Sequence, residues 1–241
     1  MKFGLFGDIH ANLEALEVVL AELEKEQVDT YICLGDIVGY GANPGECLER
    51  SRELAKFTVA GNHDYAIAGK LNIDFFNAYA KEAVLWTREQ LSKEQIQWLR
   101  DLELVHKYED QVTIVHGTLN FPEMFDYIQT SYDAHLSLEL LETPVCFLGH
   151  SHVPVAFFQG PTVSFTMDYE IDIDPNGKTL VNIGSVGQPR DENPKAAYAV
   201  YDTDRQKVEI RRVEYDVDKA ARKIVDAGLP EILGERLKYG R

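Results

Sequence analysis

The first third of the chain repeats one unit three times: a short apolar run, a glycine with polar neighbours, and then a helical pattern. The apolar runs cover residues 2–6, 30–34 and 57–60, and the first is followed by leucines at helical spacing over 13–23. A strand, a helix and a parallel strand connect with right-handed geometry in nearly all known cases. Three such units in succession therefore predict a mainly parallel sheet with helices packed on it.

Two helix starts in this region have a clear sequence signature. Asn43 supplies a cap, Pro44 occupies the first helical position and Glu46 the third. Farther on, Ser92 and Gln95 have the spacing of a capping box. We therefore expect a helix from residue 44 and a break near residue 92 in the long helical region after residue 64.

The second half of the chain changes character. The apolar runs 112–115 and 145–148 both stop at a histidine. After Pro154, turn residues separate short predicted strands at 155–158, 162–167, 179–183, 196–201 and 208–213. This pattern is typical of an antiparallel meander, and we expect it to pack face to face with the first sheet, with helices outside. Residues 217–239 return to a helical pattern, with Pro230 beginning a final turn.

The length and composition suit one globular domain. The chain has 241 residues, of which 45% are hydrophobic and 27% charged, so it can bury a sizeable core. It has no low-complexity segment, and no linker is long enough to divide it. We predict a single domain over 1–241, with a motif-bearing core over 1–215 and a C-terminal helical extension over 216–241.

Several classes of protein and partner are disfavoured. No run approaches eighteen apolar residues and no basic region precedes a long apolar stretch, so we expect no membrane span, no signal peptide and a cytoplasmic location. The three cysteines, Cys33, Cys47 and Cys146, are interpreted as buried thiols in a reducing compartment. A net charge of −16 would repel an extended nucleic-acid duplex or an anionic membrane, whereas metal cations in a pocket would still admit a small anion. The oligomeric state is left open.

Polar side chains that can hold metal ions gather where the predicted strands end. Those directly after an apolar run are Asp8, His10, Asp36, Asn62, His63, His116, His150 and His152, which include five of the seven histidines. Ligands of open α/β sheets bind beyond the carboxyl ends of the strands. Nitrogen and oxygen donors suit manganese, iron, zinc, cobalt or nickel. The set is too large for one tetrahedral ion and suits two ions that share a carboxylate, for which Asp36 between glycines is the best candidate.

In their order along the chain, these residues resemble the five motifs of the calcineurin-like metallophosphoesterases. The matching segments are Gly7-Asp8-Ile9-His10, Gly35-Asp36, Gly61-Asn62-His63-Asp64, His116-Gly117 and Gly149-His150-Ser151-His152. The resemblance implies a four-layer α/β/β/α sandwich of two mixed sheets flanked by helices. It implies one metal held by Asp8, His10, Asp36 and His152, and a second held by Asp36, Asn62, His116 and His150. Manganese is the first expectation for both.

The resemblance also implies an activity. We expect hydrolysis of phosphate esters, phosphodiesters foremost, by attack of a metal-bound hydroxide, with a small phosphorylated substrate and phosphate as product. His63 would face the phosphate as general acid or transition-state stabiliser. Asp64 either holds the ring of His63 or caps a helix.

Two positions depart from the pattern of related branches. Protein phosphatases and symmetrical dinucleoside tetraphosphatases carry aspartate and arginine three and four residues after the bridging aspartate, where this chain has Gly39 and Tyr40. The sequence is thus more similar to the compact prokaryotic phosphodiesterase branch. A phosphomonoesterase or a nucleotide phosphatase, including a protein or dinucleoside-polyphosphate phosphatase, is the alternative. A non-catalytic scaffold is least favoured, because no ligand position is missing.

Other residues are assigned from their positions alone. The loop 182–190 is interpreted as a turn that braces the metal loops, although Arg190 could border the pocket. Asn12, Tyr40 and Asn120 are further candidates for substrate contact, and His106 and His135 are interpreted as surface or structural residues. Core packing, a substrate cleft or a partner surface would each account for the aromatic residues Phe75, Phe76, Tyr79, Phe121, Phe125 and Tyr127.

Overall fold

The computed structural model describes residues 1–241, whose strands form two six-stranded mixed sheets. In spatial order, the first sheet contains β3 (Ala55–Thr58), β2 (Thr30–Cys33), β1 (Lys2–Phe6), β11 (Ala196–Asp202), β12 (Lys207–Val213) and β9 (Glu170–Asp172). The second contains β4 (Val105–Tyr108), β5 (Val112–Val115), β6 (Val145–Leu148), β10 (Thr179–Asn182), β7 (Val155–Phe158) and β8 (Ser164–Thr166). β1, β2 and β3 are parallel, as predicted.

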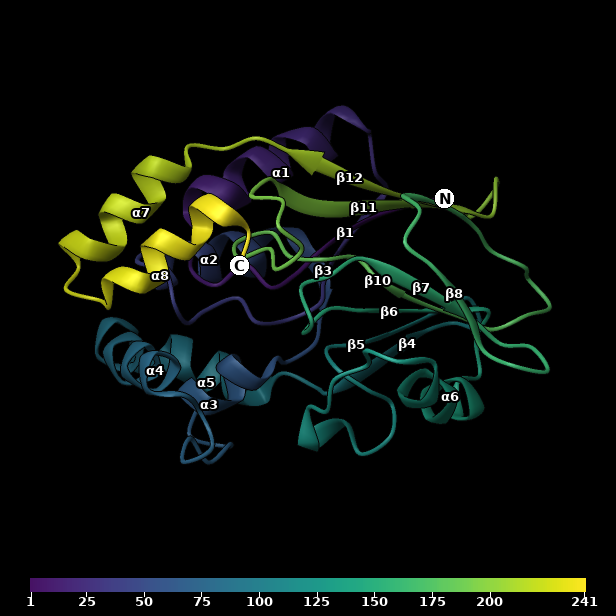
Figure 1. Ribbon diagram of the computed structural model, residues 1–241, viewed down its shortest axis with the longest axis horizontal. Coiled ribbons are helices and arrows are strands. Elements are labelled where there is room, and N and C mark those ends of the chain that lie inside the picture. Colours follow the sequence, from purple (N-terminus) through teal and green to yellow (C-terminus); the bar gives the residue numbers. More distant parts are fainter.

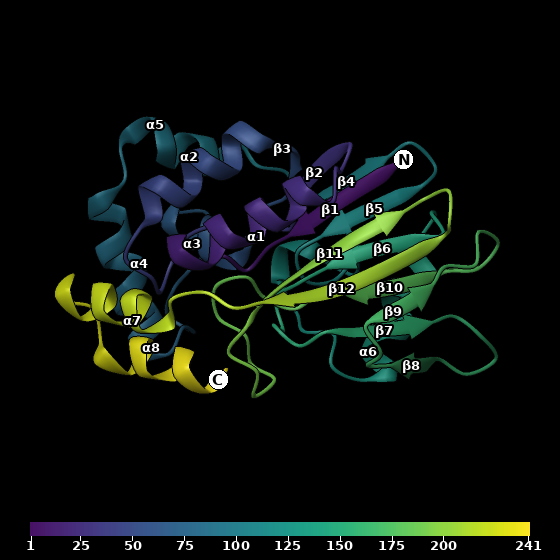
Figure 2. The ribbon, with the colours of Figure 1, turned by 90° about the horizontal axis from the view of Figure 1, so that it is seen from above.

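The two sheets pack face to face between two helical layers (Figures 1 and 2). Phe3 and Ile32 of the first sheet meet Phe147 and Val181 of the second in a shared apolar core. Helices α1 (Leu13–Lys25) and α2 (Pro44–Leu54) pack on the outer side of the first sheet, and α6 (Ser131–Leu140) packs on the second. The predicted four-layer sandwich is confirmed.

The remaining helices lie at one end of the sheets. Helices α3 (Asn62–Ile67), α4 (Ala78–Gln90) and α5 (Lys93–Asp101) are found at the same end as α7 (Val217–Asp226) and α8 (Glu231–Glu235) (Figure 1). Two short 3-10 helices complete the structure, η1 (Pro122–Met124) and η2 (Arg236–Tyr239). Leu233 and Leu237 pack with Tyr40 and with Ala83 of α4, so the end of the chain covers the loop that follows Asp36.

The five strands predicted after Pro154 form as β7, β8, β10, β11 and β12, but the prediction that they make one antiparallel meander is wrong. The later strands divide between the sheets, with β7, β8 and β10 in the second and β9, β11 and β12 in the first. β11 runs antiparallel between β1 and β12, and six of its seven residues are buried. Such an apolar run on both faces suits a central strand better than a half-exposed one. Strands β4 and β9 and helix α6 were not predicted.

The helix starts agree only in part with their sequence signatures. The capping box of α5 is confirmed, since Ser92 and Gln95 exchange side-chain and backbone hydrogen bonds. Asn43 precedes α2 but does not cap it with its side chain, because its Oδ1 accepts a hydrogen bond from Lys223 Nζ at 2.9 Å. All three cysteines are buried free thiols. The helices are all too short or too polar to cross a bilayer, and the cytoplasmic location and the division at residue 215 stay predictions.

Candidate metal centre

The predicted ligands converge where β1, β2, β5 and β6 end and α3 begins. Donor atoms form two groups, each within 4.8 Å: Asp8, His10, Asp36 and His152 in one, and Asp36, His116 and His150 in the other. All are buried, and Asp36 belongs to both groups. The half-buried Asn62 comes from the first turn of α3.

The backbone turns sharply at most of these positions. Asp8, His10 and Asp36 each have a φ of 49°, and His150 and His152 have φ values of 66° and 62°. Non-glycine residues in this left-handed region cost on the order of 1–2 kcal/mol each. Strain of this kind concentrates at functional sites, where the surrounding structure maintains it.

Two motif glycines leave room for the carboxylates. A Cβ atom at Gly61 would collide with Oδ1 of Asp36, and one at Gly149 would collide with Oδ2 of Asp8. Any side chain at either position would therefore push a carboxylate out of the cluster. This close approach explains why the motifs carry glycine beside the donor residues.

Hydrogen bonds outside the cluster orient three of the imidazoles. Nδ1 of His10, His116 and His152 lies 3.3, 2.8 and 2.6 Å from the backbone carbonyl oxygens of Val38, Leu34 and Gln188, respectively. A carbonyl can only accept, so each Nδ1 carries the proton and donates it. The Nε2 atoms are then the ring nitrogens that face the cluster, as metal-binding imidazoles require.

Several of the atoms that could ligate a metal make no hydrogen bond. The buried atoms without a hydrogen-bond partner are Oδ1 of Asn62 and Nε2 of His116 and His150, which all belong to the predicted second metal site. At the first site, Nε2 of His10 faces Nε2 of His152 at 3.1 Å. Buried polar atoms are nearly always satisfied in folded proteins. Cations at these two positions would satisfy them, so the residues present fit two metal ions.

Charge in the cluster also favours metal binding. Burial opposes ionisation of Asp36, but the neighbouring His116 outweighs it and holds the pKa of Asp36 well below its usual range. Burial lowers the pKa of His150 to about 3, so this imidazole is neutral near pH 7. In His116 the Asp36 carboxylate, 3.4 Å away, overcomes burial and raises the pKa to about 9. A metal ion would compete with that proton, so binding should release it.

His63 lies against Asp36 but is not held by a carboxylate. Its backbone N–H donates to Oδ1 of Asp36 at 2.8 Å, and its ring packs against Tyr40 and Phe76, with centroids 4.4 and 5.1 Å away. Its Nδ1 is buried without a partner. Burial lowers the pKa of His63 to about 4.

Asp64 does not hold the ring of His63, which corrects one of its two predicted roles. Its carboxylate accepts backbone N–H bonds from Asp36, Ile37, Val38 and Gly61, at 2.7, 3.0, 3.4 and 2.9 Å. It therefore caps the start of α3 and fixes the loop that carries Asp36. We assign Asp64 as a positioning residue and not as a catalytic one.

The cluster opens into a cleft of about 610 Å³. Asp36, Asn62, His63, His150 and His152 are among its lining residues. Tyr40 and Arg190 line the same cleft, in keeping with their predicted position beside the substrate.

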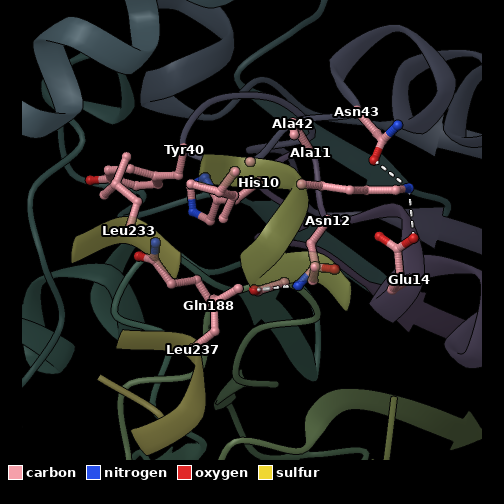
Figure 3. A pocket seen from close by; sticks show the side chains of 15 residues that line it. His10, Ala11, Asn12, Glu14, Tyr40, Ala42, Asn43, Gln188, Leu233 and Leu237 are labelled. Atoms are coloured by element: carbon pink, nitrogen blue, oxygen red, sulfur yellow. Dashed lines mark hydrogen bonds and ion pairs between the residues drawn. The ribbon is translucent and has the colours of Figure 1, made fainter. Parts of the chain in front are cut away.

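Asn12 and Asn120 do not line the cleft, contrary to prediction. The buried Asn12 side chain accepts from Ala15 N–H at the start of α1 and donates to the carbonyl of Gly187, 2.9 Å away. With His10 it lines a separate cavity of only about 10 Å³ (Figure 3). Asn120 follows Thr118, whose Oγ1 accepts its backbone N–H.

The loop 182–190 braces the first metal-binding loop, as predicted. Ser185 Oγ donates to the carbonyl oxygen of Asp8 and accepts from Gln188 N–H, both at 2.8 Å, and Gly187 N–H donates to the same Asp8 carbonyl. The sequence indicated the bracing role of the loop but not that Ser185 and Gln188 carry it, and it did not predict the contact of Phe76 with His63. No local pattern marks these residues, because their partners are distant in sequence.

The two histidines outside the motifs lie away from the cluster. Nδ1 of His106 on β4 contacts Glu103 Oε1 at 2.5 Å, and its ring stacks on Phe57. His135 is exposed on α6. Both agree with their interpretation as surface or structural residues.

Comparisons with known proteins agree with this geometry. Residues 1–206 match the calcineurin-like phosphoesterase superfamily domain. An uncharacterized protein of Methanocaldococcus jannaschii is 42% identical over 242 residues, which span 98% of this chain and 97% of that protein. A metallophosphoesterase from Sphaerobacter thermophilus has 40% sequence identity to this chain. Its crystal structure superposes with a TM-score of 0.90, covering 100% of this chain and 99% of the other.

A hypothetical protein of Pyrococcus horikoshii shares the fold at 23% identity, with a TM-score of 0.80 over 100% of this chain and 98% of the other. The family match and the relative at 42% identity both extend over most of the chain, and the fold and the Asp/His cluster agree with them. The chain therefore belongs to the calcineurin-like phosphoesterase superfamily, a family of metal-dependent phosphoesterases.

Proposed function

We propose that this protein hydrolyses phosphodiesters with two divalent transition-metal ions, manganese foremost, with iron, zinc, cobalt or nickel as alternatives. Asp8, His10, Asp36 and His152 would hold one ion, and Asp36, Asn62, His116 and His150 the other. The observation that carries the proposal is the pair of donor groups that share Asp36 and border the cleft. The unpartnered donor atoms of Asn62, His116 and His150 support it.

The chain's own residues divide the remaining work. When bound, two divalent ions supply activation of a water and stabilisation of the charge that builds on the phosphate oxygens. His63 lines the cleft beside Asp36 and is placed to donate a proton or a hydrogen bond to the leaving oxygen. Arg190 lines the same cleft and can pair with a phosphate oxygen.

The surroundings of His63 favour this branch over the protein phosphatases. A Cβ atom at Gly39 would lie 2.6 Å from Nδ1 of His63, so a carboxylate side chain does not fit there beside the ring. Tyr40 contributes an aromatic ring where a guanidinium would be expected. Monoester or nucleotide hydrolysis is the alternative, and a non-catalytic scaffold is disfavoured because the donor set is complete.

The test uses metal-stripped protein to which manganese is returned. Hydrolysis of bis(p-nitrophenyl) phosphate is compared with that of p-nitrophenyl phosphate, and we expect the diester to have the larger kcat/KM. Asp36→Asn should abolish both activities, whereas His135→Ala, on the exposed face of α6, serves as the matched control. Faster hydrolysis of the monoester would contradict the proposed preference for diesters. If neither ester were hydrolysed with any of the five metals, the proposal that the protein is an enzyme would be rejected.

A further inference from the structure

The cleft is larger than a phosphate group requires. Its volume of about 610 Å³ lies within the range of roughly 300–1,000 Å³ that is typical of sites for drug-sized ligands. The predicted metal ligands form one part of the cleft lining, and two loops supply most of the other lining residues. The organic part of the substrate must therefore contact those loops.

Both loops present apolar side chains to the cleft. The loop between α3 and α4 contributes Phe75 and Phe76, and Phe75 is 94% exposed. The loop around η1 contributes Met124, which is 65% exposed, together with Phe125 and Tyr127. Large apolar side chains left exposed at a cleft are typical of binding surfaces.

One of these side chains is already oriented by the metal cluster. The ring of Tyr127 stacks on the imidazole of His150, with centroids 3.9 Å apart and planes 11° from parallel. Its position is therefore coupled to a predicted ligand. An aromatic surface begins directly beside the expected position of the phosphate.

The charges of the cleft restrict the rest of the substrate. Arg190 is the only lysine or arginine that lines it, Glu123 lies on the same lining, and the whole chain carries −16. A polyphosphate chain or an extended nucleic acid would find too few cations here. One phosphate with a largely uncharged organic group fits better.

Polar groups on the first loop suit a heteroaromatic ring. Asn72 and Asn77 line the cleft. The side-chain oxygen of Asn72 accepts the backbone N–H of Asp74 in the same loop, and that of Asn77 caps α4 by accepting the N–H of Ala80. The amide NH₂ groups make no hydrogen bond within the protein and can donate to ring nitrogen or carbonyl acceptors.

We propose that the cleft binds a nucleoside phosphodiester with a single phosphate, whose base lies between the loop that carries Phe75 and the loop that carries Met124. This inference rests on the proposed phosphodiesterase activity. It adds a site for the organic group, formed by Phe75, Phe76, Met124, Phe125 and Tyr127.

The test compares two diesters with the same leaving group, the p-nitrophenyl ester of thymidine 5′-phosphate and methyl p-nitrophenyl phosphate. We expect the nucleoside ester to have a kcat/KM at least about 10-fold higher, since stacking of a base on an aromatic side chain contributes roughly 1–3 kcal/mol. Phe75→Ala and Met124→Ala should each reduce this preference severalfold. Both side chains are exposed, so neither change removes core packing.

Matched controls lie close to both loops, at Tyr79 in the first turn of α4 and at Phe121 beside η1. Tyr79 and Phe121 are 50% and 65% exposed but do not line the cleft, so Tyr79→Ala and Phe121→Ala should leave the preference unchanged. Equal kcat/KM values for the two esters in the unmodified protein would overturn the inference. A Phe75→Ala variant in which kcat/KM fell equally for both esters would also overturn the inference.

A binding measurement separates this inference from the proposed activity. Calorimetry with the manganese-loaded protein would compare thymidine 5′-phosphate with inorganic phosphate. We expect the nucleotide to bind about 10-fold more tightly or better, and Phe75→Ala to weaken the nucleotide alone. Equal affinities would reject the base site even in an active phosphodiesterase. A tight, Phe75-dependent nucleotide complex without turnover would instead reject the phosphodiesterase activity while keeping the base site.

Discussion

His63 is positioned by packing and not by a hydrogen bond to its ring. Its Nδ1 has no partner, the rings of Tyr40, Phe76 and His10 surround it, and Gly39 closes the inner side. The orientation of this ring therefore depends on the shape of its surroundings. Two substitutions test its role and its support separately.

His63→Ala should retain both metal ions and lose about 10²- to 10⁴-fold in kcat, the usual contribution of a positioned proton donor. Metal content and kcat are measured on the same preparation. His106→Ala, which removes a histidine that is stacked on Phe57 and belongs to neither donor group, is the control. Loss of bound metal in His63→Ala would show that this residue is a ligand.

Gly39→Ala should reduce kcat while the metal content stays the same. A Cβ atom here would lie 2.6 Å from Nδ1 of His63 and would push the ring away. Gly228→Ala is the matched control, since Gly228 also has a positive φ, 76° against 90° for Gly39, but has nothing within 4 Å of its Cβ position. Both changes should cost about 1–2 kcal/mol in backbone strain, and only Gly39→Ala should affect activity.

At the scale of elements, two lysines tie α7 to α1, and one of them also reaches the loop before α2. Lys223 Nζ bonds Glu14 Oε1 at 2.6 Å and Asn43 Oδ1 at 2.9 Å (Figure 3). The Glu14 side chain is only 6% exposed, and Lys219 contacts it at 3.1 Å. This pair attaches the C-terminal helices beside Tyr40.

Glu14→Gln should destabilise the fold by about 1–3 kcal/mol near pH 7, as expected when a buried charged hydrogen-bond partner is lost. Burial opposes the charge of Glu14, but its bonds to Lys223 and Lys219 outweigh it, so the folded pKa lies below the ordinary value of 4.5. The stabilisation is then complete above about pH 4.5 and disappears as the pH falls through the folded pKa. Urea unfolding of both proteins between pH 3 and 7 measures it.

Glu17→Gln on the same helix, which affects only an ion pair with the exposed Arg50, is the control and should have a small effect at every pH. A Glu14→Gln difference that stayed constant as the pH fell below 4.5 would contradict this account of the contact.

The elements were predictable where their patterns are local. The first three strands, α1 and the capping box at Ser92 all follow from neighbouring residues. The pairing of β11 with β1 could not be predicted, because these strands are almost two hundred residues apart and no local sequence pattern indicates their pairing. The side-chain cap at Asn43 failed for a similar reason, since Lys223 from α7 takes the oxygen that would cap α2.

At the scale of the molecule, the site was predictable because the family motifs follow strands. The carboxyl ends of β1 and β2 in the first sheet and of β5 and β6 in the second meet at the cluster. The partners of Asp64 were not predictable, since they depend on how closely the 36–38 loop approaches α3. The positions of Asn12 and Asn120 outside the cleft could not be predicted either. Donor residues are visible in a sequence, whereas contacts that orient them arise only in the folded chain.

The fold as a whole concentrates donor atoms in one buried cluster, so metal binding should stabilise it. Asp36 alone belongs to both donor groups, and this sharing is the central claim. Manganese content and the electron paramagnetic resonance spectrum of the reconstituted protein test it most directly. We expect two manganese ions per chain with a spin-coupled spectrum, and loss of the coupling in Asp36→Ala. A single ion per chain, or two ions without coupling, would contradict a centre that shares Asp36.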